Sequence, residues 1–200
     1  MRIVITRHGQ TNHNINNIIQ GHDEGEINDK GYIQVVNLSK KLKNYNIEYI
    51  ISSDIKRCRM TTEIINSYLN LGVYYEPLIR AKNNGKFVGK SNNSINWDSI
   101  KGSFISKTPP GGENLLMVRA RVRKFIKKLE NEIYSEDKTI LLVSHGGYLK
   151  NFLGYILGMQ IKESRLKLQV DNCSISEIEM YKNNSSFQYK VKFLNNISHL

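Results

Sequence analysis

Two apolar runs that each end in a His-Gly pair limit the fold of this chain more than any other feature. Residues 4–9 read VITRHG, and residues 141–146 read LLVSHG. Short runs rich in Val, Ile and Leu are typical of buried strands in an α/β sheet. In such a sheet, ligands bind in the crevice beyond the carboxyl ends of the strands. The pattern therefore predicts that His8 and His145 meet there, with Arg7 beside them, at a site suited to phosphate.

The order of the predicted elements indicates the fold class. Strands are expected over residues 2–6, 48–52, 73–76, 139–143, 174–180 and 188–194, the last two as a hairpin through residues 182–185. Helices are expected from Asp29 to about Leu42, from Asp54 to near Gly72, from Glu113 to about Tyr134 and from Tyr148 to Leu157. This alternation predicts a three-layer α/β/α sandwich with a mainly parallel central sheet.

The length of 200 residues suits one α/β domain with a core and is short for two. We therefore expect a single domain over residues 1–200. Residues 77–112 are rich in Gly and Pro and lack a regular period, which indicates a small cap or insertion over the strand ends, with a short helix around 93–100. Residues 12–28 are expected to be mostly loop, with a helical turn around 15–19.

Helical spacing also predicts how the first two helices face the sheet. Asp29 and Asp54 are expected as their N-caps. The expected inward residues are Tyr32 or Ile33, Val36, and Leu38 or Leu42 in the first helix, and Met60, Ile64 and Tyr68, with Ile65 and Leu69 beside them, in the second.

The net charge of +11 favours anionic partners. No recognised nucleic-acid-binding module accompanies the basic residues, so most of them indicate a solvated surface and no nucleic-acid partner is expected. The same interpretation covers the basic residues of the 113–134 helix, which are Arg119, Arg121, Arg123, Lys124, Lys127 and Lys128. An intermediate interpretation, between a solvated surface and a nucleic-acid-binding groove, is a basic rim that attracts phosphorylated small molecules.

The two cysteines, Cys58 and Cys173, are far apart and show no metal-ligand spacing, which indicates reduced, buried thiols. No apolar run approaches the roughly 20 residues that span a bilayer, so no membrane partner is expected. No basic leader or apolar targeting segment is visible, and we expect a cytoplasmic protein.

The residues at the strand ends can carry phosphoryl transfer. A histidine held by its other ring nitrogen can attack phosphorus and form a phosphohistidine. The charge on the transferred group needs fixed cations, and arginine forks suit its oxygens better than lysine does. The leaving alkoxide needs a proton from a positioned acid. Arg7, His8, Arg57 and His145 supply the nucleophile and the cations.

Four motifs in this chain resemble the signature of the histidine phosphatase superfamily, also called phosphoglycerate-mutase-like. They are RHGQT at residues 7–11, followed by Asn14 and QGH at 20–22; SSDIKR at 52–57, followed by Thr61 and Thr62; GGE at 111–113; and SHG at 144–146. They occur in the family's order between residue 2 and about residue 180, so the resemblance covers nearly the whole chain.

The resemblance implies a role for each matching residue. His8 would be the phosphorylated nucleophile, and Arg7, Arg57 and His145 would bind the phosphoryl group and stabilise its transition state. The implied substrate contacts come from Asn14, Gln20 and Gly21. We also expect His22, Lys82 and Gly146 to contact the substrate. The family needs no metal ion, so no cofactor is expected, in agreement with the missing ligand cluster.

One position departs from the family pattern. The family has a Leu-Arg-Glu segment, with Gly four residues after the glutamate and then an aromatic residue, Glu and Gly. Residues 78–89 fit this frame through Gly85, Phe87 and Gly89, and the frame places Ala81 where the family has its proton-donating glutamate. A methyl group cannot donate a proton, so reactions with alkoxide leaving groups should suffer most.

Three interpretations of Ala81 are open. The glutamate was replaced deliberately to trap a complex with substrate or phosphate; a neighbour, which would be Glu24, Asp23 or His22, supplies the proton; or the chain is a degenerate member that only binds. We favour the first, because every other site residue is intact and Arg80 and Lys82 keep the segment basic.

The expected function is that of a phosphomonoesterase acting on a small phosphorylated metabolite, with inorganic phosphate as the other expected ligand. The 77–112 segment is short and lacks the paired arginines of a mutase, and it looks more like the fructose-2,6-bisphosphatase branch. A phosphoglycerate mutase is the enzymatic alternative. A catalytically silent phosphate-binding or regulatory protein is the alternative from another class.

Overall fold

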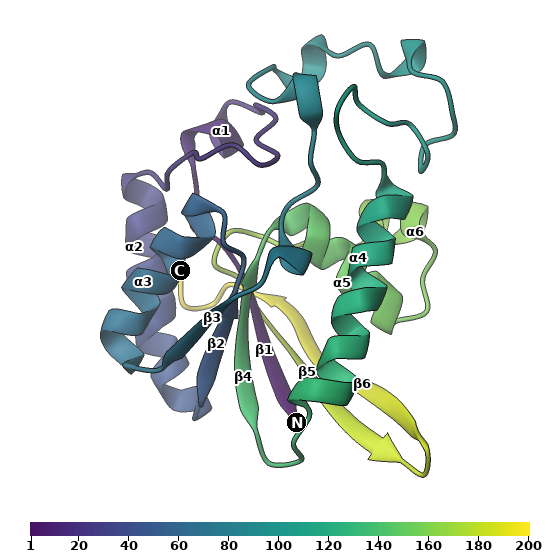
Figure 1. Ribbon diagram of the computed structural model, residues 1–200. Helices are drawn as coiled ribbons and strands as arrows, with labels where there is room; N and C mark the ends of the chain where they lie inside the picture. The colour runs from purple at the N-terminus through teal and green to yellow at the C-terminus, as the bar shows by residue number, and fades with distance from the viewer.

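The computed structural model describes residues 1–200 and contains a six-stranded sheet with helices around it (Figure 1). The strands are β1 (Arg2–Arg7), β2 (Tyr49–Ser52), β3 (Gly72–Tyr75), β4 (Thr139–Ser144), β5 (Ile175–Asn183) and β6 (Ser186–Asn196). The helices are α1 (Asn12–Ile15), α2 (Asp29–Leu42), α3 (Lys56–Leu69), α4 (Leu115–Lys128), α5 (Gly146–Ile156) and α6 (Ile161–Lys167). All six expected strands are present, and the last two form the expected hairpin.

The sheet has the strand order β3-β2-β4-β1-β5-β6. The first four strands in this order pair in parallel, and β5 pairs antiparallel with both of its neighbours, β1 and β6. The prediction of a mainly parallel sheet is confirmed. The register pairs Arg7 of β1 with Ser144 of β4. The backbone N–H of His8 then donates to the Ser144 carbonyl at 3.0 Å. Because these strands are neighbours with this register, His8 and His145 leave the sheet side by side.

Helices cover both faces of the sheet, with α2 and α3 on one face and α4 and α5 on the other (Figure 1). Alternate side chains of β1 divide between two buried clusters: Val4 packs in the cluster with α2 and α3, while Ile3 and Ile5 pack in the cluster with α4 and α5. Burial on both faces is what the near-continuous apolar strands require. The predicted three-layer α/β/α sandwich is confirmed.

Both expected N-caps are wrong. Asn28, not Asp29, caps α2, and its side chain accepts a hydrogen bond from the N–H of residue 31 at 2.8 Å. Ile55 occupies the N-cap of α3 and makes no side-chain cap bond. The Asp54 carboxylate, expected there, instead pairs with both Nε and Nη2 of Arg80. An ion pair across the chain has taken the place of a local cap.

The inward face of α2 agrees with the expected one at Leu38 and Leu42 and differs at the other positions. The buried residues are Gly31, Val35, Leu38, Ser39 and Leu42. Tyr32 and Ile33 are 55% and 60% exposed, and Val36 is only half-buried, so these expectations were wrong. The cause is a close approach at Gly31, where a Cβ would lie 2.2 Å from the Gln10 carbonyl oxygen. This contact with the loop after β1 sets the rotation of the helix.

The inward face of α3 is also different, because polar residues occupy it. Its buried residues are Arg57, Cys58, Thr61, Thr62 and Ile65, whereas Met60, Ile64 and Tyr68 are only partly buried. The Thr61 hydroxyl accepts from the Gly9 N–H at 3.0 Å and donates to the Arg57 carbonyl at 2.7 Å. The helix therefore turns toward the His8 loop. The apolar spacing predicted only part of its inward face: Ile65 is buried as expected, and Ile64 and Leu69 pack against the core while partly exposed.

Residues 77–112 lie beyond the carboxyl ends of the strands, in the upper part of Figure 1. They form four 3₁₀ turns, Pro77–Ile79, Gly85–Phe87, Asn92–Ser94 and Trp97–Ser99, the last two where one short helix was expected.

Three helical features differ from the expectation. α1 begins three residues before the expected turn, α4 ends at Lys128 and continues as a π-helical turn over Leu129–Ile133, and α6 was not predicted. None of the helices has both the length and the apolar character needed to cross a membrane.

Candidate active site

His8 is buried directly after β1, and its two ring nitrogens have different partners. Nδ1 lies 2.8 Å from the Gly9 carbonyl oxygen and carries the proton that it donates there. Nε2 accepts from the Arg57 Nε–H at 3.3 Å, so it is unprotonated. Burial and the charges of Arg57 and Arg7 hold the pKa of His8 well below its usual value. The ring is therefore neutral and offers a nucleophilic nitrogen.

Arg57 lies on α3 beside this nitrogen and is 1% exposed. Its Nη1 donates to the Asp23 carbonyl at 3.0 Å, and its Nη2 donates to the Gly21 carbonyl at 2.8 Å. No carboxylate lies within ion-pair distance of the guanidinium. A buried cation paired only with carbonyls and a neutral histidine is suited to an incoming anion.

Arg7 and His145 complete this cluster. Arg7 donates from Nη1 to the Val170 carbonyl at 3.0 Å, while its Nε is buried and has no partner. Leaving a buried donor unpaired costs on the order of 1–3 kcal/mol. The Arg7 side chain lines the same cavity as His8, so its guanidinium is placed to bind an anion there. The His145 ring centroid is 5.3 Å from that of His8, and its Nε2 lies 2.9 Å from the Ser53 hydroxyl.

Gly146 gives Arg7 its position. A Cβ at this glycine would lie 3.2 Å from the Arg7 Nε and 3.4 Å from its Cζ. Any larger residue after His145 would therefore press on the guanidinium. The second His-Gly pair supplies both a ring and the space for the arginine of the first pair.

Asn14 and Gln20 present amides to the same place. Asn14 Oδ1 accepts from the Thr11 N–H at 3.1 Å and from Asn172 Nδ2 at 3.3 Å, which leaves its own Nδ2 free to donate. Gln20 Oε1 is buried and has no partner. Gly21 follows with a positive φ of 55°, the conformation in which its carbonyl accepts from Arg57.

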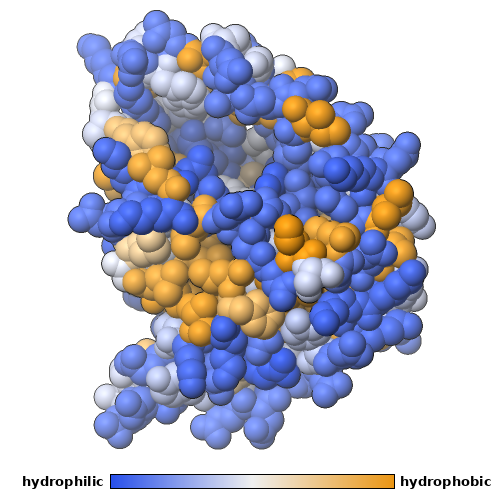
Figure 2. All heavy atoms as spheres, turned by 180° about the vertical axis from the view of Figure 1, so that it is seen from behind, coloured by the Kyte–Doolittle hydropathy of each residue, from blue (hydrophilic) through white to orange (hydrophobic).

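These side chains line a cavity of about 820 Å³. Nine of the residues predicted for the site line it: Arg7, His8, Asn14, Gln20, Arg57, Ala81, Lys82, His145 and Gly146. Gly21 and His22 do not line it, but both contact residues that do. The Gly21 carbonyl accepts from Arg57, and His22 Nε2 lies 2.9 Å from the Ala81 carbonyl oxygen. Seen from behind, the upper part of the molecule is hollowed, and most of the surface around the hollow is hydrophilic (Figure 2).

The acidic side chains near residue 81 face elsewhere. The Asp23 carboxylate pairs with His13 at 3.5 Å, and Glu24 lines a separate depression with Lys56 and Arg59. Among the residues that line the 820 Å³ cavity, Asp171 is the one acidic residue, and its Oδ2 accepts from Gln169 and Asn195. None of these carboxyl groups stands where Ala81 does.

Arg121 and Asn172 hold parts of the site in place through hydrogen bonds that the sequence did not predict. Arg121, expected on a solvated face, instead donates to the carbonyls of Leu78, Arg80 and Ala81 and pairs with Glu113 at 2.9 Å. Arg119 is also buried, so the solvated interpretation was wrong for both arginines.

Asn172 Nδ2 donates to the His8 carbonyl at 2.8 Å. No sequence pattern pointed to the contacts of Arg121 or Asn172.

The two cysteines are buried free thiols, as expected. Cys58 Sγ lies 3.4 Å from His145 Nε2, and burial raises the pKa of its thiol to about 12, so the group stays protonated. No group of three or more His, Cys, Asp or Glu side chains is arranged to hold a metal ion.

The comparisons with known proteins agree with this geometry. The family model of the histidine phosphatase superfamily (branch 1) matches residues 3–192, and the chain belongs to that superfamily. The resemblance that its motifs indicated is confirmed.

Two curated relatives show the range of named activities. The chain is 29% identical over 208 residues to a broad-specificity phosphatase of Saccharomyces cerevisiae, covering 100% of this chain and 87% of that protein. It is 28% identical over 185 residues to the "Probable phosphoglycerate mutase GpmB" of Erwinia tasmaniensis, covering 90% and 85%. The expected enzyme class, a phosphatase, is confirmed at this level.

A solved structure shares the fold. The alpha-ribazole phosphatase from Shigella flexneri superposes with a TM-score of 0.83 at 24% identity, covering 98% of this chain and 96% of that one.

The two buried histidines predict a pH dependence of stability. Burial, followed by the positive charge of Arg57, holds the pKa of His8 and of His145 well below the usual 6.5. Below about pH 6.5 the unfolded chain binds protons that the native state excludes. The free energy of unfolding therefore decreases as the pH is lowered. We expect a loss of about 2–3 kcal/mol between about pH 7.5 and about pH 5.5, measured by urea denaturation.

His8→Gln provides the control for this linkage. It removes one of the two fully buried histidines, so it should remove up to about half of the pH-dependent loss; His22 and His199, whose pKa values burial also lowers, add a smaller part that remains. A free energy of unfolding that does not change over this interval would show that the rings take up protons in the native state as readily as in the unfolded chain.

Proposed function

We propose that the chain is a phosphomonoesterase that hydrolyses a small phosphorylated metabolite through a phosphohistidine at His8. The observation that carries this proposal is the state of the His8 ring. Gly9 fixes its proton on Nδ1, and the unprotonated Nε2 points at the buried Arg57 guanidinium. The nucleophilic nitrogen and the guanidinium that would bind the phosphoryl group thus lie next to each other in the cavity.

The reaction has two displacements. In the first, His8 Nε2 forms a bond to phosphorus while the bond from phosphorus to the leaving oxygen breaks. Arg7, Arg57 and His145 bind the equatorial oxygens, with further donation from the Asn14 amide. In the second, water attacks phosphorus, the bond to His8 breaks and inorganic phosphate leaves. Every cation in these steps is a side chain of the protein, and the proposal gives no role to a metal ion.

Ala81 limits the first displacement. The leaving alkoxide has no carboxylic acid at position 81, and Asp23 and Glu24 face away from the cavity. His22 is turned toward the Ala81 carbonyl, so its Nε2 is occupied there. We therefore propose slow turnover with alkyl phosphates, in keeping with a chain that holds substrate or phosphate. Residues 77–112 serve as a cap on the single domain.

Phosphoenzyme labelling tests the proposal. An aryl phosphate needs little help from an acid, so it should phosphorylate the chain rapidly and leave an acid-labile, base-stable label. His8→Asn should remove the label, while His13→Asn, at a histidine outside the cavity, should keep it. No label on the unmodified chain, or a label that survives His8→Asn, would contradict the proposed nucleophile.

A further inference from the structure

The cavity carries more positive charge than one phosphoryl group needs. Six cationic side chains line it, Arg7, Arg57, Lys82, Lys150, Arg165 and Lys167, against the single carboxylate of Asp171. Arg7 and Arg57 stand beside His8, and Lys167 is exposed and paired with Glu163. The remaining three, Lys82, Lys150 and Arg165, form what we call the distal cation cluster. The proposed reaction at His8 gives them no task.

Arg165 is the centre of this cluster. It lies on α6, and its Nη1 is so near the backbone that a Cβ at Gly147 would lie 2.9 Å from it. Its guanidinium makes no hydrogen bond and no ion pair within the protein. Burial lowers the pKa of Arg165, and no acidic group offsets this effect.

The packing of α6 on α5 holds Arg165 at the cavity wall. A Cβ at Gly154 would lie 2.2 Å from the Cβ of Ser164, so the two helices approach as closely as a glycine allows. Lys150, on the facing helix α5, donates from Nζ to the Arg165 carbonyl at 3.4 Å. Lys150 and Arg165 are therefore carried by two helices that pack tightly against each other.

Lys82 approaches the cluster from the 77–112 segment. Its Nζ donates to Asn84 Oδ1 at 3.0 Å and lies 5.5 Å from the centre of the Trp97 ring. Burial and the charge of Arg165 lower the pKa of Lys82 to about 8. Lys82 and Arg165 also line a second cavity of about 540 Å³, together with Trp97 and Phe104. The cluster thus lies where the two cavities meet, under that segment.

Cations that are partly desolvated and that repel one another destabilise the empty site, and a bound anion relieves this cost. A cavity of about 820 Å³ has room for much more than a phosphoryl group. We propose that the distal cation cluster binds a second acidic group of the substrate. The substrate class is then a phosphomonoester that carries a further phosphate or a carboxylate. This inference rests on the proposed function, because His8 defines which phosphoryl group reacts.

Calorimetric binding to the unmodified chain tests this inference, since slow turnover permits equilibrium measurements. Two matched pairs separate the possible second groups: fructose 6-phosphate against fructose 1,6-bisphosphate, and glycerol 3-phosphate against 3-phosphoglycerate. We expect the doubly acidic member of at least one pair to bind about ten- to a hundredfold more tightly. A preference in the first pair identifies a phosphate subsite, and one in the second identifies a carboxylate subsite.

Arg165→Gln should remove most of this preference, and Lys150→Gln should reduce it. Lys162→Gln, on the same helix but exposed and outside the cavity, is the control and should leave the preference intact. The inference is overturned if neither pair shows a preference, or if Lys162→Gln removes as much of it as Arg165→Gln does. Failure of the proposed function would look different, because the phosphoenzyme label would be missing while the binding preference persisted.

Discussion

Ala81→Glu is expected to raise kcat for sugar phosphates by about a hundredfold or more, and kcat for an aryl phosphate by far less. Ala81 lines the cavity with His8, and its carbonyl is fixed by Arg121 and His22, so the new carboxyl group starts from a held backbone. A sugar alkoxide needs a proton when it leaves, whereas an activated phenolate needs little. Steady-state phosphate release with both substrates measures the two gains.

Ala81→Gln is the matched control, because it has nearly the same shape and cannot act as a carboxylic acid. It should leave both rates close to those of the unmodified chain. Equal gains for both substrates in Ala81→Glu would mean that the glutamate acts on binding or on packing. No gain for either would remove the missing acid as the reason for slow turnover.

The same measurements separate the alternative functions. A silent phosphate-binding protein would bind phosphate, form no phosphoenzyme and gain nothing from Ala81→Glu. A phosphoglycerate mutase would interconvert 2- and 3-phosphoglycerate and retain the phosphoryl group. Relatives of this chain have names of both enzymatic kinds, so the ratio of transfer to release decides between them.

The centre of the fold could be predicted from the sequence because it depends on local patterns. The runs that end at His8 and His145 are short and apolar, and the period of a buried strand needs no long-range information. Once both are parallel strands of one sheet, their carboxyl ends lie at the same edge. The register of Arg7 with Ser144 then brings the two rings to a centroid distance of 5.3 Å.

The rotation of the helices could not be predicted in this way. α3 turns buried polar residues, Arg57 and Thr61, toward the His8 loop, so a search for apolar spacing selected Met60 and Ile64 instead. α2 turns on a backbone contact at Gly31, which has no hydropathy signal at all. In both helices, contacts with the site loop add to the amphipathic pattern, which still places Leu38, Leu42 and Ile65 inward.

Long-range polar contacts were equally hidden. The partners of Arg121 are backbone carbonyls about forty positions earlier in the chain, at Leu78, Arg80 and Ala81. Every residue has a backbone carbonyl, so a hydrogen bond to one leaves no recognisable motif in the sequence. The charge pattern of α4 therefore placed Arg121 on a solvated face, although its guanidinium binds backbone carbonyls within the fold.

Arg121→Ala is expected to lower the free energy of unfolding by about 3–5 kcal/mol. The guanidinium and the Glu113 carboxylate are 17% and 16% exposed, and removing one partner leaves the other charge largely buried. Burial by itself raises the pKa of Glu113, yet Arg121 and the Asn83 N–H hold it below its usual value, so the carboxylate depends on these donors. Urea denaturation at neutral pH measures the loss.

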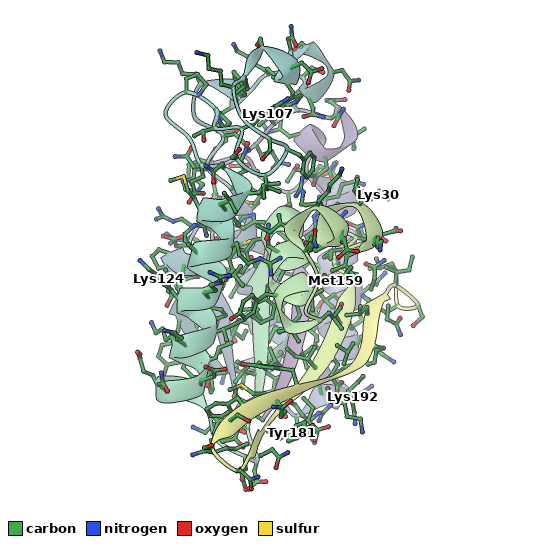
Figure 3. The ribbon with its side chains drawn as sticks, turned by 90° about the vertical axis from the view of Figure 1, so that its right-hand side faces the viewer. Lys30, Lys107, Lys124, Met159, Tyr181 and Lys192 are labelled. Carbon is green, nitrogen blue, oxygen red and sulfur yellow. The ribbon has the colours of Figure 1, made fainter.

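Lys124→Ala is the control on the same helix, because Lys124 is exposed on the outer side of α4 (Figure 3). It should cost less than about 0.5 kcal/mol. Arg121→Lys keeps the charge but cannot bond three carbonyls and a carboxylate at once, so it should fall between the two. If Arg121→Ala costs no more than Lys124→Ala, the arginine does not hold the segment.

The position of residue 81 and the contacts of Arg121 should be coupled. Arg121 Nη2 donates to the Ala81 carbonyl at 3.1 Å, so the rate gained by Ala81→Glu requires that bond. In the double variant with Arg121→Lys, which keeps more of the stability, the gain with sugar phosphates should shrink by about tenfold, since a small displacement of a catalytic group costs rate steeply. Independent effects would show instead that the new glutamate reaches the leaving group without the Arg121 contacts, and that these contacts serve stability alone.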